Sequence, residues 1–136
     1  MPESSTHLRL VSALVEWISG EYFRKGKGSI LIDSPESIAQ GKPPGIDGYV
    51  PDVFGSNSSA GGVVIGEAKT AGDLENVHTR EQLAAFLRYC SANPGSVFVF
   101  AVPWHMTRYA RNLIEIVRRT QDCGDVTTVV LEKLEG

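Results

Sequence analysis

Residues 97–102 form a continuously apolar run with the sequence VFVFAV. A strand with one solvated face alternates apolar and polar residues, whereas a strand covered on both faces is apolar throughout. The run therefore predicts a central strand with helices packed on both faces of its sheet. Asn93-Pro94-Gly95 immediately before it is a strong helix stop. A helix that ends there and a buried strand that follows are typical of layered α/β proteins.

The rest of the chain alternates between helical and strand patterns. Apolar residues at helical spacing predict helices over 7–22, 79–92 and 107–120. Strands are expected over 29–32, 47–54, 63–69, 97–102 and 127–131, with loops over 36–45 and 70–77 and a Gly/Ser-rich hairpin connection over 55–62. The order is αβββαβαβ. Three early strands in a meander and two later strands linked by helices predict an α/β protein with a mixed central β-sheet flanked by helices.

Composition limits the class of protein. With 136 residues, 42% hydrophobic and 21% charged, the chain is expected to form a single domain over 1–136. It has no apolar run of the roughly 20 residues that a membrane span needs, and no signal-peptide pattern, so we expect a cytoplasmic protein with no membrane partner. The net charge of -3 argues against nonspecific coating of nucleic acid. Cys90 and Cys123 form no C-x-x-C motif, so neither a zinc site nor a disulfide scaffold is indicated.

The predicted strand 63–69 becomes ionic at its end. Side chains alternate between the two faces of a strand, so Glu67 and Lys69 project the same way as Val63 and Ile65. Asp52, directly after Pro51, lies near the end of the preceding predicted strand. If the two strands pair as a hairpin, Asp52 approaches Glu67, although the register is not set by the sequence.

Two neighbouring carboxylates repel each other, and a divalent cation removes the conflict. Oxygen ligands suit Mg²⁺ or Mn²⁺, which polarise a scissile phosphate and acidify a bound water. Lys69 is then placed to orient the attacking water or to stabilise charge on phosphorus. This set of side chains predicts metal-dependent hydrolysis of a phosphodiester.

Pro51-Asp52 and Glu67-Ala68-Lys69 resemble the motif of the PD-(D/E)xK nuclease superfamily. The predicted order of elements over residues 7–103 resembles that family's restriction-endonuclease-like αβββαβ core, here with an extra C-terminal αβ. The resemblance implies that Asp52, Glu67 and the backbone carbonyl of Ala68 are metal ligands and that Lys69 is the catalytic lysine.

Some RecB-like members of this family carry Q-x-x-x-Y on the helix after the lysine. Gln82 matches the glutamine and is a further candidate catalytic residue, but Phe86 stands where the tyrosine would be. Gln82 has a second interpretation as the capping-box partner of Thr79. Other members contribute a metal-binding glutamate from the first helix, for which Glu16 and Glu21 are both candidates.

The remaining chemically active residues receive structural interpretations. The three histidines share no ligand spacing and are interpreted as non-metal residues, although His78 is close enough to the site in sequence to touch substrate. Asp73 and Glu75 are interpreted as solvated loop acids, with the alternative that a loop beside a metal site contributes one of them. Both tryptophans are interpreted as core or rim packing in preference to base-stacking platforms. The histidines are His7, His78 and His105, and the tryptophans are Trp17 and Trp104.

Basic residues form two groups in the sequence. We prefer the first for phosphate contact because it flanks a glycine-rich break, and we interpret the second as a solvated helix face. The first group is Arg24, Lys25 and Lys27, and the second is Arg108, Arg111, Arg118 and Arg119.

The resulting functional prediction is a Mg²⁺-dependent deoxyribonuclease that hydrolyses DNA phosphodiester bonds. A domain of this size suits a homodimer, as in the Holliday-junction resolvases that the pattern resembles, or a subunit of a larger repair or restriction complex. The alternative is a catalytically inactive module of the same fold that binds protein or nucleic acid.

Overall fold

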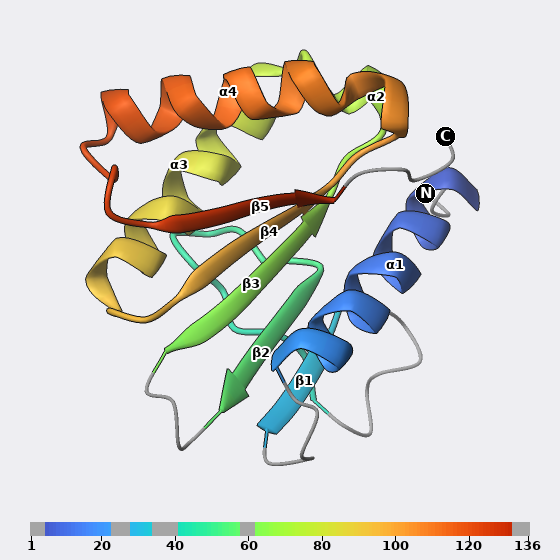
Figure 1. Ribbon diagram of the computed structural model, residues 1–136, viewed down its shortest axis with the longest axis vertical. Coiled ribbons are helices and arrows are strands. Elements are labelled where there is room, and N and C mark those ends of the chain that lie inside the picture. Colours follow the sequence, from blue (N-terminus) through green and yellow to red (C-terminus); the bar gives the residue numbers. More distant parts are fainter. Residues whose placement is uncertain (1–4, 23–27, 34–40, 58–61, 132–136) are drawn as a thin grey trace.

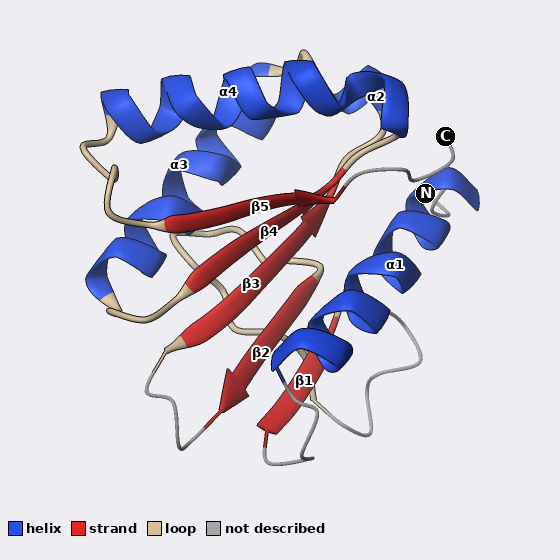
Figure 2. Cartoon of the chain, viewed as in Figure 1, coloured by secondary structure: helices blue, strands red, loops and turns tan. Residues whose placement is uncertain are grey.

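The computed structural model describes residues 5–22, 28–33, 41–57 and 62–131. Within these ranges, five strands form one mixed sheet in the order β1-β2-β3-β4-β5, and four α-helices pack against it (Figures 1 and 2). The elements are α1 (Ser5–Tyr22), β1 (Gly28–Ile32), β2 (Val53–Asn57), β3 (Val63–Ala68), α2 (Ala71–Leu74), α3 (Val77–Ala92), β4 (Val97–Ala101), the 3₁₀ turn η2 (Trp104–Met106), α4 (Thr107–Thr120) and β5 (Thr127–Leu131). The expected mixed α/β sheet is confirmed.

The sheet combines two kinds of pairing. Strands β1, β2 and β3 form an antiparallel meander, and β3, β4 and β5 run parallel to one another. The two parallel connections pass through α3 and α4, as strand crossovers require. The carboxyl ends of β3, β4 and β5 therefore lie along one edge of the sheet, which Figure 1 shows next to α2 and the first turns of α1.

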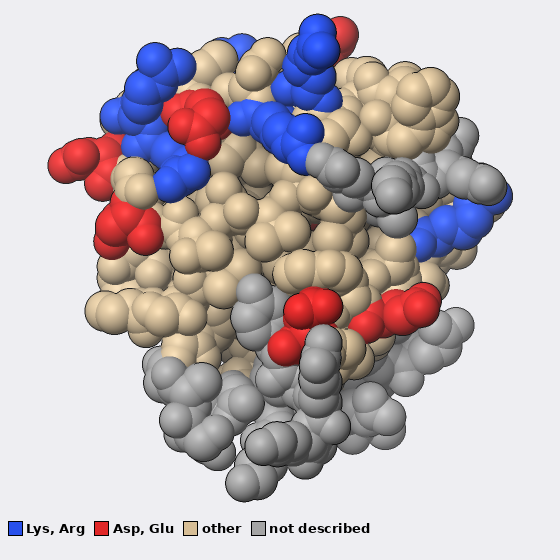
Figure 3. Space-filling view, in the orientation of Figure 1, with Lys and Arg blue, Asp and Glu red and all other residues tan. Residues whose placement is uncertain are grey.

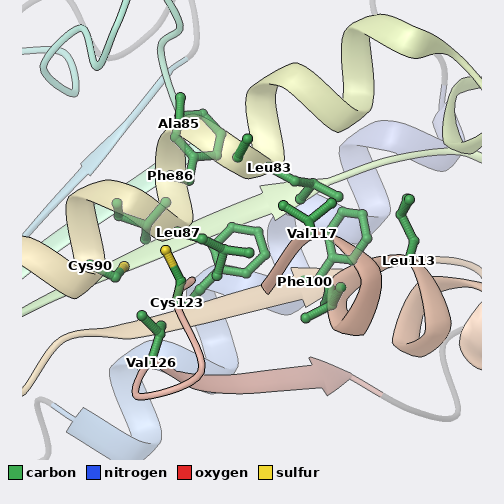
Figure 4. Packing of buried hydrophobic residues seen from close by; sticks show 14 of the residues in the cluster. Leu83, Ala85, Phe86, Leu87, Cys90, Phe100, Leu113, Val117, Cys123 and Val126 are labelled. Atoms are coloured by element: carbon green, nitrogen blue, oxygen red, sulfur yellow. The ribbon is translucent and has the colours of Figure 1, made fainter. Parts of the chain in front are cut away.

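Both faces of the sheet are covered. Helix α1 buries Leu10, Leu14 and Ile18 against one face, and α3 and α4 pack on the other. Strand β4 is buried at every position, as its unbroken apolar sequence predicts. On the α3–α4 face, aromatic and aliphatic side chains from both helices meet Phe98 and Phe100, part of which Figure 4 shows.

The two cysteines belong to this core and carry free thiols. Burial raises the pKa of Cys90 to about 12, and the pKa of Cys123 is raised by the same cause. Both are therefore protonated, inert packing residues near neutral pH. None of the helices in the described ranges is long and apolar enough to cross a membrane.

The predicted strand over 47–54 is wrong in its first half. Asp47 and Gly48 have positive φ angles of 50° and 85°, and Ile46 and Tyr49 exchange backbone hydrogen bonds of 2.7 and 2.9 Å. This is the two-residue turn that an Asp-Gly pair favours, so the chain reverses there instead of extending. Strand β2 begins only at Val53.

The loop expected over 55–62 is also partly wrong. Residues 55–57 continue β2, where Gly55 pairs with Val64 of β3 and with Ile30 of β1. Central pairing on both sides overrides the weak strand propensity of glycine and serine. Residues 58–61 of the predicted connection lie outside the described residues.

A short helix, α2, occupies part of the loop expected over 70–77. Helix α3 then begins two residues earlier than predicted, because Asn76 caps it by accepting a hydrogen bond of 2.9 Å from the N–H of His78. Thr79, the predicted cap, lies inside the helix, and its hydroxyl donates to the carbonyl of Asp73 at 2.6 Å. This hydrogen bond connects the first turn of α3 to α2.

Candidate metal and catalytic site

Asp52 and Glu67 meet where the β2–β3 ladder ends. Val53 pairs with Gly66, so the next position outward places Asp52 opposite Glu67. The N–H of Asp52 donates to Oε1 of Glu67 at 3.1 Å, and the N–H of Ala68 donates to Oδ2 of Asp52 at 2.9 Å. Each carboxylate is thus held by a main-chain donor of the opposite strand, and both orientations are set by the backbone.

Glu67 is an unusual strand residue because its carboxyl is almost entirely removed from water. The residue is only 3% exposed. Burial, followed by the nearby Asp52 carboxylate, holds the pKa of Glu67 well above its usual value, although the Lys69 ammonium acts in the opposite direction. A buried acid of this kind is destabilised when ionised, and it gains most from a cation that binds it.

Lys69 supplies the positive charge of the group. Its Nζ lies 3.5 Å from Oε2 of Glu67, which matches the shared side expected from strand alternation. Its backbone N–H donates to the carbonyl of Ala101 at 3.0 Å, so the parallel pairing with β4 continues one residue beyond β3. The side chain is 15% exposed and Asp52 is 13% exposed, so this end of the site reaches the surface.

A fourth side chain joins the group from α1. Nε2 of His7 lies 3.4 Å from Oδ2 of Asp52. Sequence reasoning interpreted His7 as a non-metal residue and did not predict its contact with Asp52. The helical spacing of His7 with Leu10 and Leu14 was a usable signal, because it places the imidazole on the buried face of α1. The partner carboxylate on another element could not be found that way.

The first-helix glutamates are placed elsewhere. Glu16 and Glu21 are both exposed. At about 1.5 Å rise per residue, they lie about 13 and 21 Å along the axis of α1 from His7. The α1 side chain that the structure places against Asp52 is that of His7.

Gln82 lies in the second turn of α3, on the side of the sheet that the alternation of β3 assigns to Ile65 and Glu67. Its capping-box interpretation is wrong, because the helix is capped by Asn76. The Oε1 atom of Gln82 is buried and has no hydrogen-bond partner among the described residues. A buried amide oxygen without a donor costs free energy, so it marks a place where a water or a ligand hydrogen fits.

The donors suit a small divalent cation that keeps part of its water shell. In an extended strand the N–H and C=O of one residue point to the same side, so the Ala68 carbonyl is directed, like its N–H, toward Asp52. Mg²⁺ is commonly held by one or two carboxylates and completed by waters and substrate phosphates. The described residues contain no group of three or more His, Cys, Asp and Glu side chains arranged to hold a metal by themselves. The available set is therefore Asp52, Glu67 and the Ala68 carbonyl.

Of the two groups of basic residues, the structure describes only the one on α4. Arg24, Lys25 and Lys27 lie outside the described residues. On the face seen in Figure 3, basic side chains gather over α4, where Arg108, Arg111 and Arg119 are exposed. Arg118 is partly buried, where it pairs with Glu115 at 2.9 Å and donates to the Gly124 carbonyl at 2.7 Å.

No protein-family model, curated protein or solved structure matches this chain. The chemistry of the site is therefore inferred from the geometry and burial of its own residues.

Proposed function

We propose that this protein is a Mg²⁺-dependent deoxyribonuclease that hydrolyses DNA phosphodiester bonds. The observation that carries the proposal is the convergence of Asp52, Glu67 and Lys69 at the carboxyl edge of the parallel strands. Two acids and an ammonium, one of the acids almost completely buried, are costly to fold together unless they bind something. A divalent cation and a phosphate satisfy both signs of charge.

Asp52, Glu67 and the Ala68 carbonyl would hold Mg²⁺ or Mn²⁺. When bound, the cation polarises the scissile phosphate and lowers the pKa of a coordinated water. His7, in contact with Asp52, would orient that carboxylate. Cation binding also removes the penalty of ionising Glu67, whose raised pKa otherwise favours the protonated acid.

Lys69 would act on the substrate. Its ammonium lies 3.5 Å from Oε2 of Glu67 and compensates the buried carboxylate. If a cation took over the charge of Glu67, the ammonium would be able to contact a phosphate oxygen and would stabilise charge developing on phosphorus. Gln82 has a free buried acceptor, and we assign it to holding a water or Lys69 in position.

The finer fold assignment belongs to the same proposal. The order α1-β1-β2-β3-α3-β4, with α2 inserted, is consistent with a restriction-endonuclease-like αβββαβ core, and α4 with β5 would be the extra C-terminal unit. A homodimer or a larger repair or restriction assembly would supply the DNA contact area that one small domain lacks.

The alternative function is a non-catalytic binding module of the same fold. The hydrogen bonds of Asp52 and Glu67 to main-chain donors favour it, because they give both carboxylates a structural role as ends of the strand ladder. Binding of a cation distinguishes the two functions, since a purely structural pair has no need of one.

The test is Mg²⁺-dependent cleavage by the purified full chain. Linear duplex, single-stranded and branched DNA are incubated with Mg²⁺, with Mn²⁺ and with EDTA. We expect cleavage only with a divalent cation, loss of activity in Asp52→Asn, and a rate about 10²- to 10³-fold lower in Lys69→Ala.

Lys42→Ala is the matched control, because Lys42 is exposed and pairs only loosely with Asp33 at 3.8 Å. Cleavage that persists in Asp52→Asn would identify a contaminant or another site. A wild-type protein that neither cleaves nor binds Mg²⁺ by calorimetry would support the non-catalytic module.

A further inference from the structure

Trp104 is exposed at the start of η2, where a packing residue was expected. The residue is 63% exposed, whereas Trp17 is partly buried against the α1-side core as predicted. An exposed tryptophan costs free energy in water, since its large ring favours burial. The sequence interpretation allowed core or rim packing, and the exposure excludes core packing for Trp104 and leaves its ring accessible for binding.

The backbone that carries this ring is well anchored. Pro103, just before it, is buried, and its carbonyl accepts a hydrogen bond of 2.8 Å from the N–H of Met106. The Thr107 hydroxyl donates to the Trp104 carbonyl at 2.8 Å, and the ring of His105 meets the indole edge-on at a centroid distance of 5.6 Å. A ring held on a rigid turn loses little freedom when it binds.

Trp104 also lies on the same edge of the sheet as the candidate site. Ala101, the last residue of β4, accepts the hydrogen bond from the N–H of Lys69 at 3.0 Å. Trp104 comes three positions after Ala101, which limits the distance between their Cα atoms to about 11 Å. In nucleic acid this corresponds to about three nucleotides of helical rise along one strand.

Basic side chains continue from the ring along α4. Arg108 and Arg111 lie three residues apart in the first two turns of α4, which follows the η2 turn directly, so they share one face of that helix, and both are exposed. Arg111 also lines a hollow of about 230 Å³ between α4 and β5. Figure 3 shows Lys and Arg side chains over α4 on one face of the molecule. Exposed rings at Trp104 and Tyr109 interspersed with cations differ from an apolar protein-docking patch, whose core is depleted of charge.

We infer that Trp104 stacks on an unpaired base, with Arg108 and Arg111 contacting the phosphates of the same strand. The inference rests on the proposed nuclease function and specifies its substrate: DNA with a single-stranded segment beside the bond that is cut. Base stacking on an aromatic ring is tolerant of sequence, and it needs a base that is free of the duplex stack.

The experiment measures binding without cleavage. A fluorescein-labelled single-stranded DNA of mixed sequence and the matching duplex are titrated with the full chain in EDTA. We expect Trp104→Ala to bind the single strand about 10- to 100-fold more weakly, with little change for the duplex, and Trp104→Phe to retain most of the affinity. Arg108→Ala should weaken both ligands alike and reduce the dependence on salt.

Ile116→Ala is the control for an exposed apolar residue on α4, since Ile116 is 42% exposed. Single-strand affinity that is unchanged in Trp104→Ala, or absent in the wild type, would overturn the inference. So would a wild-type dimer that becomes a monomer in Trp104→Ala, because the ring would then be a contact between copies. These binding results do not depend on catalysis. If Trp104→Ala cleaved DNA at the wild-type rate, the nuclease proposal would stand, and only the inference that Trp104 stacks on a base would be contradicted.

Discussion

The backbone N–H of Asp52 donates to the side chain of Glu67 at 3.1 Å, so the two acids of the candidate site are joined through a main-chain bond. The arrangement places a carboxylate that is nearly inaccessible to water next to a second one that reaches the surface. Such a pair is stable only when a proton, the Lys69 ammonium or a cation offsets its charge.

Replacement of the buried acid should stabilise the metal-free protein at high pH. In the unfolded chain Glu67 ionises near 4.5, whereas its pKa in the folded protein is raised well above that value. Folding therefore takes up a proton between the two pKa values, and stability falls as the pH rises through this window. We expect Glu67→Gln to match the wild type near pH 4 and to melt a few degrees higher at pH 8, at about 4 °C per kcal/mol. Thermal unfolding in EDTA from pH 4 to 9 measures this, with the exposed Glu75→Gln as control; parallel curves for Glu67→Gln and wild type would contradict it.

Divalent cations should reverse this pH dependence. A cation that binds only the folded protein at 100 times its dissociation constant adds about 2.7 kcal/mol of stability. We expect Mg²⁺ or Mn²⁺ to raise the melting temperature of the wild type at pH 8 and to leave Glu67→Gln unchanged. The comparison is made by scanning calorimetry with Mg²⁺ and with EDTA. An equal response in both proteins would place cation binding away from Glu67.

The contact of His7 with Asp52 predicts a role in cation affinity. Loss of a group that orients a metal-binding carboxylate commonly lowers affinity 10- to 100-fold. We expect about this loss of Mn²⁺ affinity in His7→Ala, measured by isothermal titration calorimetry. His105→Ala is the matched control, because His105 is exposed and lies on another element. Equal affinities of the two variants would show that His7 has no part in the site.

The unpartnered Oε1 of Gln82 predicts opposite effects on stability and activity. Gln82→Met keeps the length of the side chain and removes a buried acceptor that has no donor among the described residues. The free energy of unfolding should rise by about 1 kcal/mol, while DNA cleavage should slow. Urea unfolding and cleavage rates, both measured on the same preparation, check this. Lower stability together with unchanged cleavage would show that Gln82 is a packing residue.

Two glycines predict a large contrast in stability. A Cβ at Gly62 would clash with the backbone carbonyl group of Gly95, whereas a Cβ at Gly72 meets nothing within 4 Å. Gly62 precedes the N–H of Val63 that donates to Ser96 at 3.0 Å, so Gly62→Ala would push the start of β3 away from the loop before β4. We expect a loss of about 1–3 kcal/mol for Gly62→Ala and a gain of up to about 1 kcal/mol for Gly72→Ala in α2. Chemical denaturation of both variants measures the contrast, and equal stabilities would contradict it.

Most helices and strands could be predicted from local pattern. Continuous burial of β4, the apolar face of α1 and the helical spacing in α4 are all visible in the sequence, because burial on a regular element imposes its own period. The errors fall where turn chemistry or pairing prevailed. The Asp47-Gly48 turn interrupts an apparent strand, and pairing on both sides extends β2 through Gly55.

The candidate site divides in the same way. Strand alternation alone places Glu67 and Lys69 on one side of β3, because that relation is local to a single strand. The meeting of Asp52 with Glu67 requires the β2–β3 register, and the contact with His7 requires the docking of α1. The exposure of Trp104 likewise depends on what packs around η2. Residue order thus defines which chemical groups each element carries and which way they face, whereas distances between groups on different elements follow from long-range packing, which local patterns do not encode.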